Sequence, residues 1–290
     1  MVRDRAHRLS ARVAAHARRV GGSSVKTRVV RVTDWTSPVP PVYREVRAAT
    51  PEAPEGKPPL LFVPGFGHGA WVFAEHWLEH AASRAFPAHA VSLRGHGGSG
   101  PAPKATLRAY AHDVVQVAAS LPRQAVLVGH GAGALVVAHA LARYPARAGV
   151  LVAPVFGGWG TLGAALRRNP VGTLPAVFGG ALRLNHRQLF SRELPDAAAR
   201  DYASRLGRAS SRAQWQLLRH RAPEPAVGNP PLLVLGSPDD RVVPPAALTR
   251  AAGRYGAAPL LFPGMGHDMM LDARWREPID AILDWLDKDL

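Results

Sequence analysis

The chain has 290 residues, 47% of them hydrophobic and 20% charged, which suits one globular domain with a sizeable core and excludes a disordered chain. It contains no cysteine, which excludes disulfides, thiolate nucleophiles and cysteine metal sites and fits a reducing compartment such as the cytoplasm. Its formal net charge is +15, and nearly all of the cations are arginine.

The first residues of the chain are rich in arginine and alanine and end at Gly21-Gly22-Ser23-Ser24. They lack the apolar core of a secretory signal, so we expect residues 1–24 to form a basic, flexible extension, with a basic amphipathic helix or a transit-like presequence as the alternatives. Elsewhere the arginines are scattered and no nucleic-acid-binding motif accompanies them. We therefore attribute the charge to coding bias rather than to a surface for nucleic acid, acidic lipid or an anionic substrate, and we expect no nucleic-acid partner.

Short apolar runs alternate with helical stretches along the rest of the chain. The predicted strands cover residues 29–32, 42–46, 60–63, 88–93, 125–128, 149–153, 232–235 and 260–262. The predicted helices cover about residues 74–84, 107–121, 132–143, 245–255 and 274–289. This alternation indicates an α/β fold, with a mostly parallel sheet covered by helices on both faces. In such a sheet the ligand site lies at the carboxyl ends of the strands.

The alternation is interrupted at residues 156–229, which are helical in character and rich in Leu, Phe and Arg. A structureless loop of that length is unusual in a compact domain, so we predict a helical cap inserted over the strand ends. The core then comprises residues 25–155 and 230–290. No part of the chain approaches the roughly 18 consecutive apolar residues of a membrane-spanning helix, so we expect no stable membrane insertion.

Glycine-rich segments follow four of the predicted strands. They are Pro64-Gly65-Phe66-Gly67-His68-Gly69, Gly129-His130-Gly131-Ala132-Gly133, Gly236-Ser237-Pro238-Asp239-Asp240-Arg241 and Pro263-Gly264-Met265-Gly266-His267-Asp268. The second segment has the pattern of a nucleophile elbow, the sharp strand-to-helix turn that carries the catalytic residue; the third contains aspartates and the fourth a histidine. This chain order of elbow, acid and histidine is that of α/β-hydrolases. With these segments and the Leu-Arg-Gly-His-Gly-Gly-Ser run at 93–99, the chain from about residue 60 onward resembles the α/β-hydrolase fold-1 family, on its lysophospholipase- and monoglyceride-lipase-like branch.

Members of that family use a Ser-His-Asp triad and bind the oxyanion with two backbone amides. The resemblance implies that His267 is the histidine and that Asp240 is the acid, with Asp239 as the alternative register. It places the two oxyanion-hole amides at Phe66 and Ala132.

The chain departs from the family's pattern at two positions. Pro64 stands where the family has histidine. The oxyanion donor there is a backbone N–H, so this change alone need not abolish binding of the oxyanion. Gly131 stands where the family has its serine nucleophile. Loss of that nucleophile lowers turnover by roughly a 10⁶ factor, while the oxyanion hole and binding still leave about 10³ to 10⁴ over water. We therefore expect no ordinary acyl-enzyme, unless Ser92 or Ser99 reaches the base as a relocated nucleophile.

Four further side chains are candidates for contact with substrate. His68, Trp71 and His130 flank the oxyanion loop and the elbow, and Trp159 lies in the predicted cap; each also has a plain structural interpretation as a packing residue. No histidine pattern typical of a metal site occurs, and the glycine-rich segments lack the Lys-Ser/Thr ending of a phosphate loop. We expect neither a metal nor a cofactor.

Three functions fit these residues. The first is an enzyme that acts on a small, mostly apolar carbonyl or ester-like compound through a His267–Asp240 general base, as an atypical hydrolase, a lyase or a cyclase. The second is a catalytically degenerate hydrolase that binds a small molecule without turning it over. The third is a serine hydrolase whose nucleophile has been replaced by Gly131. We favour the first, because a site without catalytic activity does not require a paired acid and histidine.

Overall fold

The structure, a computed structural model, describes residues 38–53, 56–157, 163, 166–167, 169–177, 184–219 and 222–290. The predicted extension at 1–24, the predicted strand at 29–32 and Trp159 lie outside these residues. Within the described ranges, no helix is both long enough and apolar enough to cross a membrane.

A mostly parallel sheet organises the described chain. Its strands within the described residues are β1 (Val46–Ala49), β2 (Leu60–Val63), β3 (Ala88–Val91), β4 (Val126–His130), β5 (Ala148–Val152), β6 (Leu232–Gly236) and β7 (Leu260–Leu261). They lie in the order β1-β3-β2-β4-β5-β6-β7, in which β1 pairs antiparallel with β3 and every other pair is parallel. The predicted fold class is confirmed. Because parallel strands end at one edge, the segments after β2, β4, β5 and β6 meet there.

The central strands are buried on both faces, which explains why their sequences are continuously apolar. Successive side chains of β2 point to opposite faces of the sheet. Leu60 and Phe62 pack into one hydrophobic core, where the ring of Phe62 lies 5.9 Å from that of Trp77. Leu61 and Val63 pack into the other core. Both cores must therefore be covered by helices.

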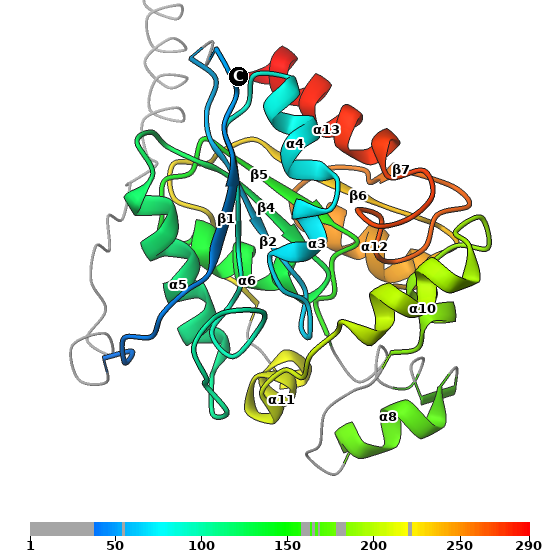
Figure 1. The fold of residues 1–290 in the computed structure, drawn as a ribbon. Helices are drawn as coiled ribbons and strands as arrows, with labels where there is room; N and C mark the ends of the chain where they lie inside the picture. The colour runs from blue at the N-terminus through cyan, green and yellow to red at the C-terminus, as the bar shows by residue number, and fades with distance from the viewer. Residues whose placement is uncertain are drawn as a thin grey trace, which may run out of the picture. The chain divides into compact units, whose positions relative to one another are not determined.

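Helices lie over both faces of the sheet (Figure 1). Those that pack into the core of Phe62 are α3 (Trp71–Ala74), α4 (Trp77–Ser83) and α13 (Arg276–Asp289). Those that pack into the core of Leu61 are α5 (Leu107–Ser120), α6 (Ala132–Leu141) and α12 (Pro245–Gly253). This two-layer cover leaves the carboxyl edge of the sheet as the place where loops can form a site.

Two predicted elements differ from the structure. The helix predicted at about 74–84 corresponds to α4 but starts later, at Trp77. A separate short helix, α3, precedes it, and the two are separated at His76, whose backbone angles (φ −142°, ψ −49°) are not helical. The strand predicted at 42–46 starts only at Val46 in β1. The residues just before it bond the loop after β3 instead, with Tyr43 O accepting from Gly100 N at 2.9 Å.

The segment at 156–229 contains helices and, among its described residues, no strand. The helices whose bounds the structure describes there are α8 (Pro170–Val177), α9 (His186–Leu189), α10 (Asp196–Ser204) and α11 (Ser211–Arg219). Arg205, at the end of α10, joins this segment to α3: its guanidinium lies 3.8 Å from the ring centroid of Trp71 and 3.2 Å from Glu75 Oε2. The segment thus packs beside the loop that follows β2.

Candidate active site

A sharp turn joins β4 to α6, and Gly131 is its central residue. Gly131 has φ +55° and ψ −124°, a conformation that strains any residue with a side chain. Its N–H donates to Val152 O and its carbonyl accepts from Val155 N, both at 2.9 Å, so the turn is anchored on the end of β5. A Cβ on the nearby Gly133 would lie 2.4 Å from Pro64 O. The start of α6 therefore packs directly against the loop after β2.

A buried histidine–aspartate pair lies beside this turn. His267 Nδ1 is 2.8 Å from Asp240 Oδ2, and each residue is 3% exposed. The other carboxylate oxygen of Asp240 accepts the N–H groups of Val242 at 2.6 Å and Val243 at 3.0 Å. Asp239, the alternative register, is exposed and accepts from Gly264 N instead. The carboxylate oriented toward His267 is that of Asp240.

The other ring nitrogen of His267 faces the elbow. A Cβ on Gly131 would lie 3.1 Å from His267 Nε2. Burial by itself would lower the pKa of His267, but the charge and hydrogen bond of Asp240 raise the pKa above its ordinary value. His267 is therefore held with Nδ1 toward a carboxylate and Nε2 toward the space above Gly131.

A cavity of about 330 Å³ opens onto these residues. Its wall includes His267 together with Phe66 and Ala132, whose amides were the predicted oxyanion donors. As the first residue of α6, Ala132 has an N–H without an intrahelical acceptor. The apolar part of the wall includes Val155, Leu184, Leu206, Trp215, Leu217 and Val242. Arg208 and Arg241 line it too, while none of its described lining residues is acidic.

The remaining predicted site residues fall in different places. His68 lines the cavity. Trp71 and His130 are not among the described lining residues: Trp71 stacks on Arg205, and His130 is completely buried beneath the elbow. The hydroxyl of Ser92 donates to Glu45 at 2.6 Å, and that of Ser99 donates to Ser92 O at 2.6 Å. Both serine hydroxyls are thus held by other partners.

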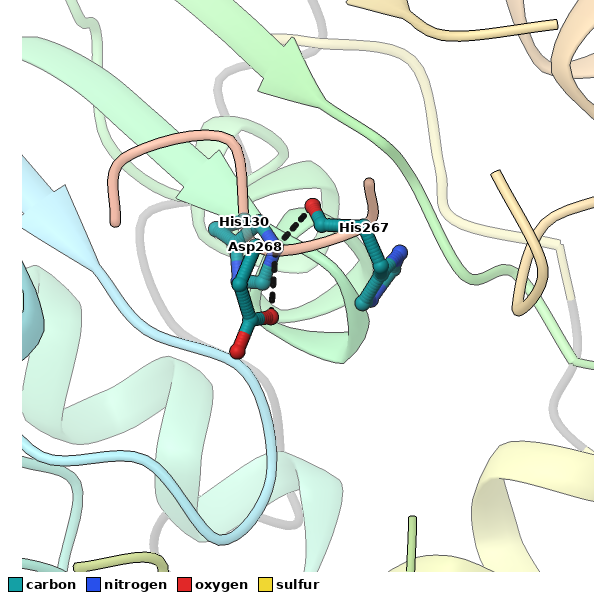
Figure 2. Close-up of side chains that lie close together, drawn as sticks. All are labelled: His130, His267 and Asp268. Carbon is teal, nitrogen blue, oxygen red and sulfur yellow. Dashed lines mark hydrogen bonds and ion pairs between the residues drawn. The ribbon is translucent and has the colours of Figure 1, made fainter. Parts of the chain in front are cut away.

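The sequence reasoning did not select Asp268, which follows His267 and has no exposed surface. Its Oδ2 is 2.9 Å from His68 Nε2, and its Oδ1 is 3.6 Å from His130 Nε2. His130 Nε2 is also 3.1 Å from the carbonyl oxygen of His267 (Figure 2). In the sequence, only the position of Asp268 next to His267 could have marked it as a site residue, because its side-chain partners lie in distant segments.

The protonation of this cluster is set by burial and by neighbouring charges. Burial alone would raise the pKa of Asp268, but the charge and hydrogen bond of His68, followed by the charge of His130, lower the pKa to about 2. Burial lowers the pKa of His130 to about 3, and the charge of His267 acts in the same direction. Asp268 is therefore a carboxylate and His130 a neutral imidazole at neutral pH.

One possible ligand atom from each of His130, His267 and Asp268 lies within 4.8 Å of the other two, close enough to hold a metal ion (Figure 2). Each residue already has a protein partner: the carbonyl of His267 for His130, Asp240 for His267 and His68 for Asp268. These contacts form a hydrogen-bonded network, in which the buried His130 Nδ1 and Asp268 Oδ1 have no hydrogen-bond partner among the described residues.

The chain belongs to the Alpha/beta hydrolase family, whose sequence profile matches residues 60–283. Members of this superfamily are mostly hydrolases, and the reaction of this chain is left open by the match.

Solved structures share the fold. A monoacylglycerol lipase from Paleococcus ferrophilus has 20% identity and a TM-score of 0.66, over 87% of this chain and 100% of that one. An esterase from Rhodococcus sp. ECU1013 has 22% identity and a TM-score of 0.66, over 86% and 96%. E-2-(acetamidomethylene)succinate hydrolase has 25% identity and a TM-score of 0.62, over 85% and 96%. A search of the curated proteins finds no significant match.

Proposed function

We propose that the protein is an enzyme that acts on a small, mostly apolar carbonyl or ester-like compound by general-base chemistry at His267, without a covalent acyl intermediate. The proposal is supported most directly by the orientation of the His267 ring. Its Nε2 faces the space above Gly131, while its Nδ1 is hydrogen-bonded to Asp240 at 2.8 Å. A base that is buried, oriented and open toward a cavity is the arrangement that proton transfer needs.

Water is the nucleophile that fits the space above Gly131. As the water oxygen bonds the carbonyl carbon, His267 Nε2 takes the water proton, and the carbonyl electron pair moves to oxygen. The amides of Phe66 and Ala132 stabilise that oxyanion, while the Asp240 carboxylate stabilises the imidazolium. Collapse of the intermediate breaks the bond to the leaving group, which receives the proton from His267. With an acidic C–H in the substrate, the same base removes that proton and the same amides hold the enolate.

The cavity wall indicates what such a substrate looks like. Its apolar side chains outnumber its polar ones, so an acyl or aryl body fits better than a sugar or a nucleotide. The two arginines and the missing acidic side chains among the described lining residues also tolerate an anionic substituent. A compact ester or ketone, neutral or with one carboxylate, is the class we propose.

The test compares the unchanged chain with His267→Ala, Gly131→Ser and Gly131→Ala in assays with p-nitrophenyl acetate and butyrate. We expect slow turnover without a burst in the unchanged chain and its loss in His267→Ala. If the chain is instead a serine hydrolase whose nucleophile has been replaced, Gly131→Ser should add a burst of one acyl group per protein molecule, whereas Gly131→Ala, which adds only the Cβ, should not. The double variant Gly131→Ser with His267→Ala is expected to lose the gain.

Two results would oppose the proposal. Equal rates in the unchanged chain and His267→Ala would remove His267 as the base. Ligand binding without turnover in any variant would favour the second candidate, a ligand-binding protein built on a degenerate hydrolase. The 3.1 Å approach of His267 Nε2 to the Cβ position of Gly131 fits glycine at this residue under either candidate, since a serine would require a shift of a few tenths of an ångström.

A further inference from the structure

We propose that Asp268 is a positioning residue of this site: it holds the loop Gly65–His68 and the elbow at fixed positions relative to His267 by bridging His68 and His130. This inference rests on the proposed function, because positioning matters only if the base and the oxyanion amides act together. The proposed general-base chemistry assigns no role to Asp268, His68 or His130.

The place of Asp268 in the chain suits such a role. It follows His267 directly, so movement of its backbone moves the base. Its N–H donates to Leu189 O at 2.9 Å, and a Cβ on Gly266 would lie 2.4 Å from that same carbonyl oxygen. The histidine loop is therefore packed tightly under the end of α9. From this anchored backbone, the Asp268 side chain reaches two other segments of the site.

The first of these segments is the loop after β2. His68 Nε2 faces Asp268 Oδ2 at 2.9 Å, and His68 Nδ1 faces Phe66 O at 3.2 Å. Both partners are acceptors, so both contacts are hydrogen bonds only when both ring nitrogens carry a proton. Through this ring, Asp268 orients the peptide that follows Phe66, next to the amide proposed as an oxyanion donor.

The second segment is the elbow. His130 Nε2 lies 3.1 Å from its hydrogen-bond acceptor His267 O, so the proton of this neutral ring is favoured at Nε2. Asp268 Oδ1 lies 3.6 Å from the same nitrogen, beyond hydrogen-bond distance, and attracts its N–H electrostatically. The buried Nδ1 of His130 has no hydrogen-bond partner within the described chain. The imidazoles of His68 and His130 are 5.6 Å apart, edge to face, and a Cβ on Gly65 would lie 3.4 Å from Nδ1 of each. The two rings therefore lie on the side of Gly65 where a side chain would stand.

A buried carboxylate also stabilises a fold without serving a site, so a control must separate the two roles. Asp272 provides it. Asp272 lies in the same loop, is 1% exposed, and accepts from Gly266 N at 2.6 Å and from Ser191 Oγ at 2.6 Å. It contacts neither His68 nor His130 in the described structure. Asp272→Asn therefore perturbs the loop and its anchoring without touching the imidazoles.

The experiment is side-chain ¹⁵N NMR of the histidines in the full chain, with amide exchange at Phe66, for the unchanged protein, Asp268→Asn and Asp272→Asn. We expect Asp268→Asn to shift the ring signals of His68 and His130, to leave the Asp240-bonded proton of His267 in place, and to speed Phe66 exchange at least tenfold. Asp272→Asn is expected to leave the His68 and His130 ring signals unchanged. In the ester assay, Asp268→Asn should lower kcat about 10- to 100-fold with little change in KM.

Two variants of His68 test the same contacts if Asp268→Asn does not fold. In His68→Gln the amide nitrogen stands near the former Nε2 and keeps the bond to Asp268, whereas in His68→Asn it stands near Nδ1 and keeps the bond to Phe66 O. We expect His68→Asn to shift the His130 signals and His68→Gln to leave them nearly unchanged while releasing the Phe66 amide.

Unchanged ring signals of His68 and His130 in Asp268→Asn would overturn the inference, as would identical responses to the Asp268 and Asp272 substitutions. The NMR measurement needs no turnover. If the signals move as expected but no variant turns over any ester, the proposed function fails and the positioning network stands. If turnover depends on His267 while Asp268→Asn changes neither the signals nor kcat, the proposed function stands and the network fails.

Discussion

His267 Nε2 lies 3.1 Å from the point where a Cβ on Gly131 would stand. The ring is thus slightly closer to the elbow backbone than a serine side chain would comfortably allow. Glycine is also the residue that accepts φ +55° at this turn without strain. Backbone conformation and histidine position therefore both match glycine at residue 131, and the consequences are measurable.

The first prediction concerns stability at the elbow. Gly131→Ala should destabilise the fold by about 1 to 3 kcal/mol, because the turn strains any residue with a Cβ and His267 must shift. Gly133→Ala should cost more, since its Cβ would lie 2.4 Å from Pro64 O, a backbone atom that cannot move alone. Urea unfolding of both variants tests this order. A Gly131→Ala variant as stable as the unchanged chain would contradict it.

The second prediction concerns pH. The neutral form of His267 is the base, and Asp240 raises its pKa above the ordinary value. Turnover should therefore rise with pH through a midpoint above that of an ordinary histidine. Asp240→Asn removes the carboxylate and leaves burial, which lowers the pKa, so the midpoint should move to lower pH while the plateau rate falls by about 10⁴. A pH–rate profile with the same midpoint in both proteins would refute the pairing.

The same linkage affects stability. The folded chain binds the proton of His267 more tightly than the unfolded chain does. Its contribution to the free energy of unfolding is therefore complete below the unfolded pKa and is lost as the pH rises through the folded pKa. In Asp240→Asn this loss on raising the pH should disappear, which denaturation at a series of pH values measures.

A third prediction concerns the attachment of the segment at 156–229. Arg205→Ala removes the stacking on Trp71 and the ion pair with Glu75, which together are worth about 1 kcal/mol at this partly exposed position. Local opening around α10 should increase about fivefold in amide exchange. Arg205→Lys keeps the charge but not the planar group, so it should recover only part of the loss. If Arg205→Lys exchanged around α10 as slowly as the unchanged chain, the charge alone would explain the attachment and the stacking on Trp71 would contribute nothing.

The fourth prediction concerns a buried ion pair, Arg94 with Asp113, that is not among the described residues of the cavity wall. Asp113 accepts from Arg94 Nε at 2.7 Å and Nη2 at 2.6 Å, and its side chain has no exposed surface. Asp113→Asn leaves the buried guanidinium uncompensated and should cost about 3 to 5 kcal/mol. Asp284→Asn, at an exposed pair with Arg84, should cost far less, because solvent screens that pair. Equal costs in urea unfolding would show that burial does not govern these pairs.

Local patterns were sufficient to predict the sheet and the positions of the site segments. Short apolar runs marked β2, β4, β5 and β6, since strands buried on both faces are continuously apolar. The carboxyl ends of parallel strands share one edge, so the glycine-rich segments that follow these strands are expected to lie together. The resemblance then supplied the candidate roles of His267 and Asp240. Boundaries failed where tertiary contacts decided them, as at His76 and Tyr43.

The sequence by itself determined that residue 131, which the resemblance predicts to be the nucleophile position, has no side chain. Only the tertiary structure decided that Asp240 rather than Asp239 meets His267, because both follow β6 and only the turn geometry orients one carboxylate inward. The same holds for Asp268 and His68, which are 200 positions apart. Their pairing depends on strand order and burial, which place two loops far apart in the chain at one edge of the sheet. No local sequence pattern predicts a contact between such loops.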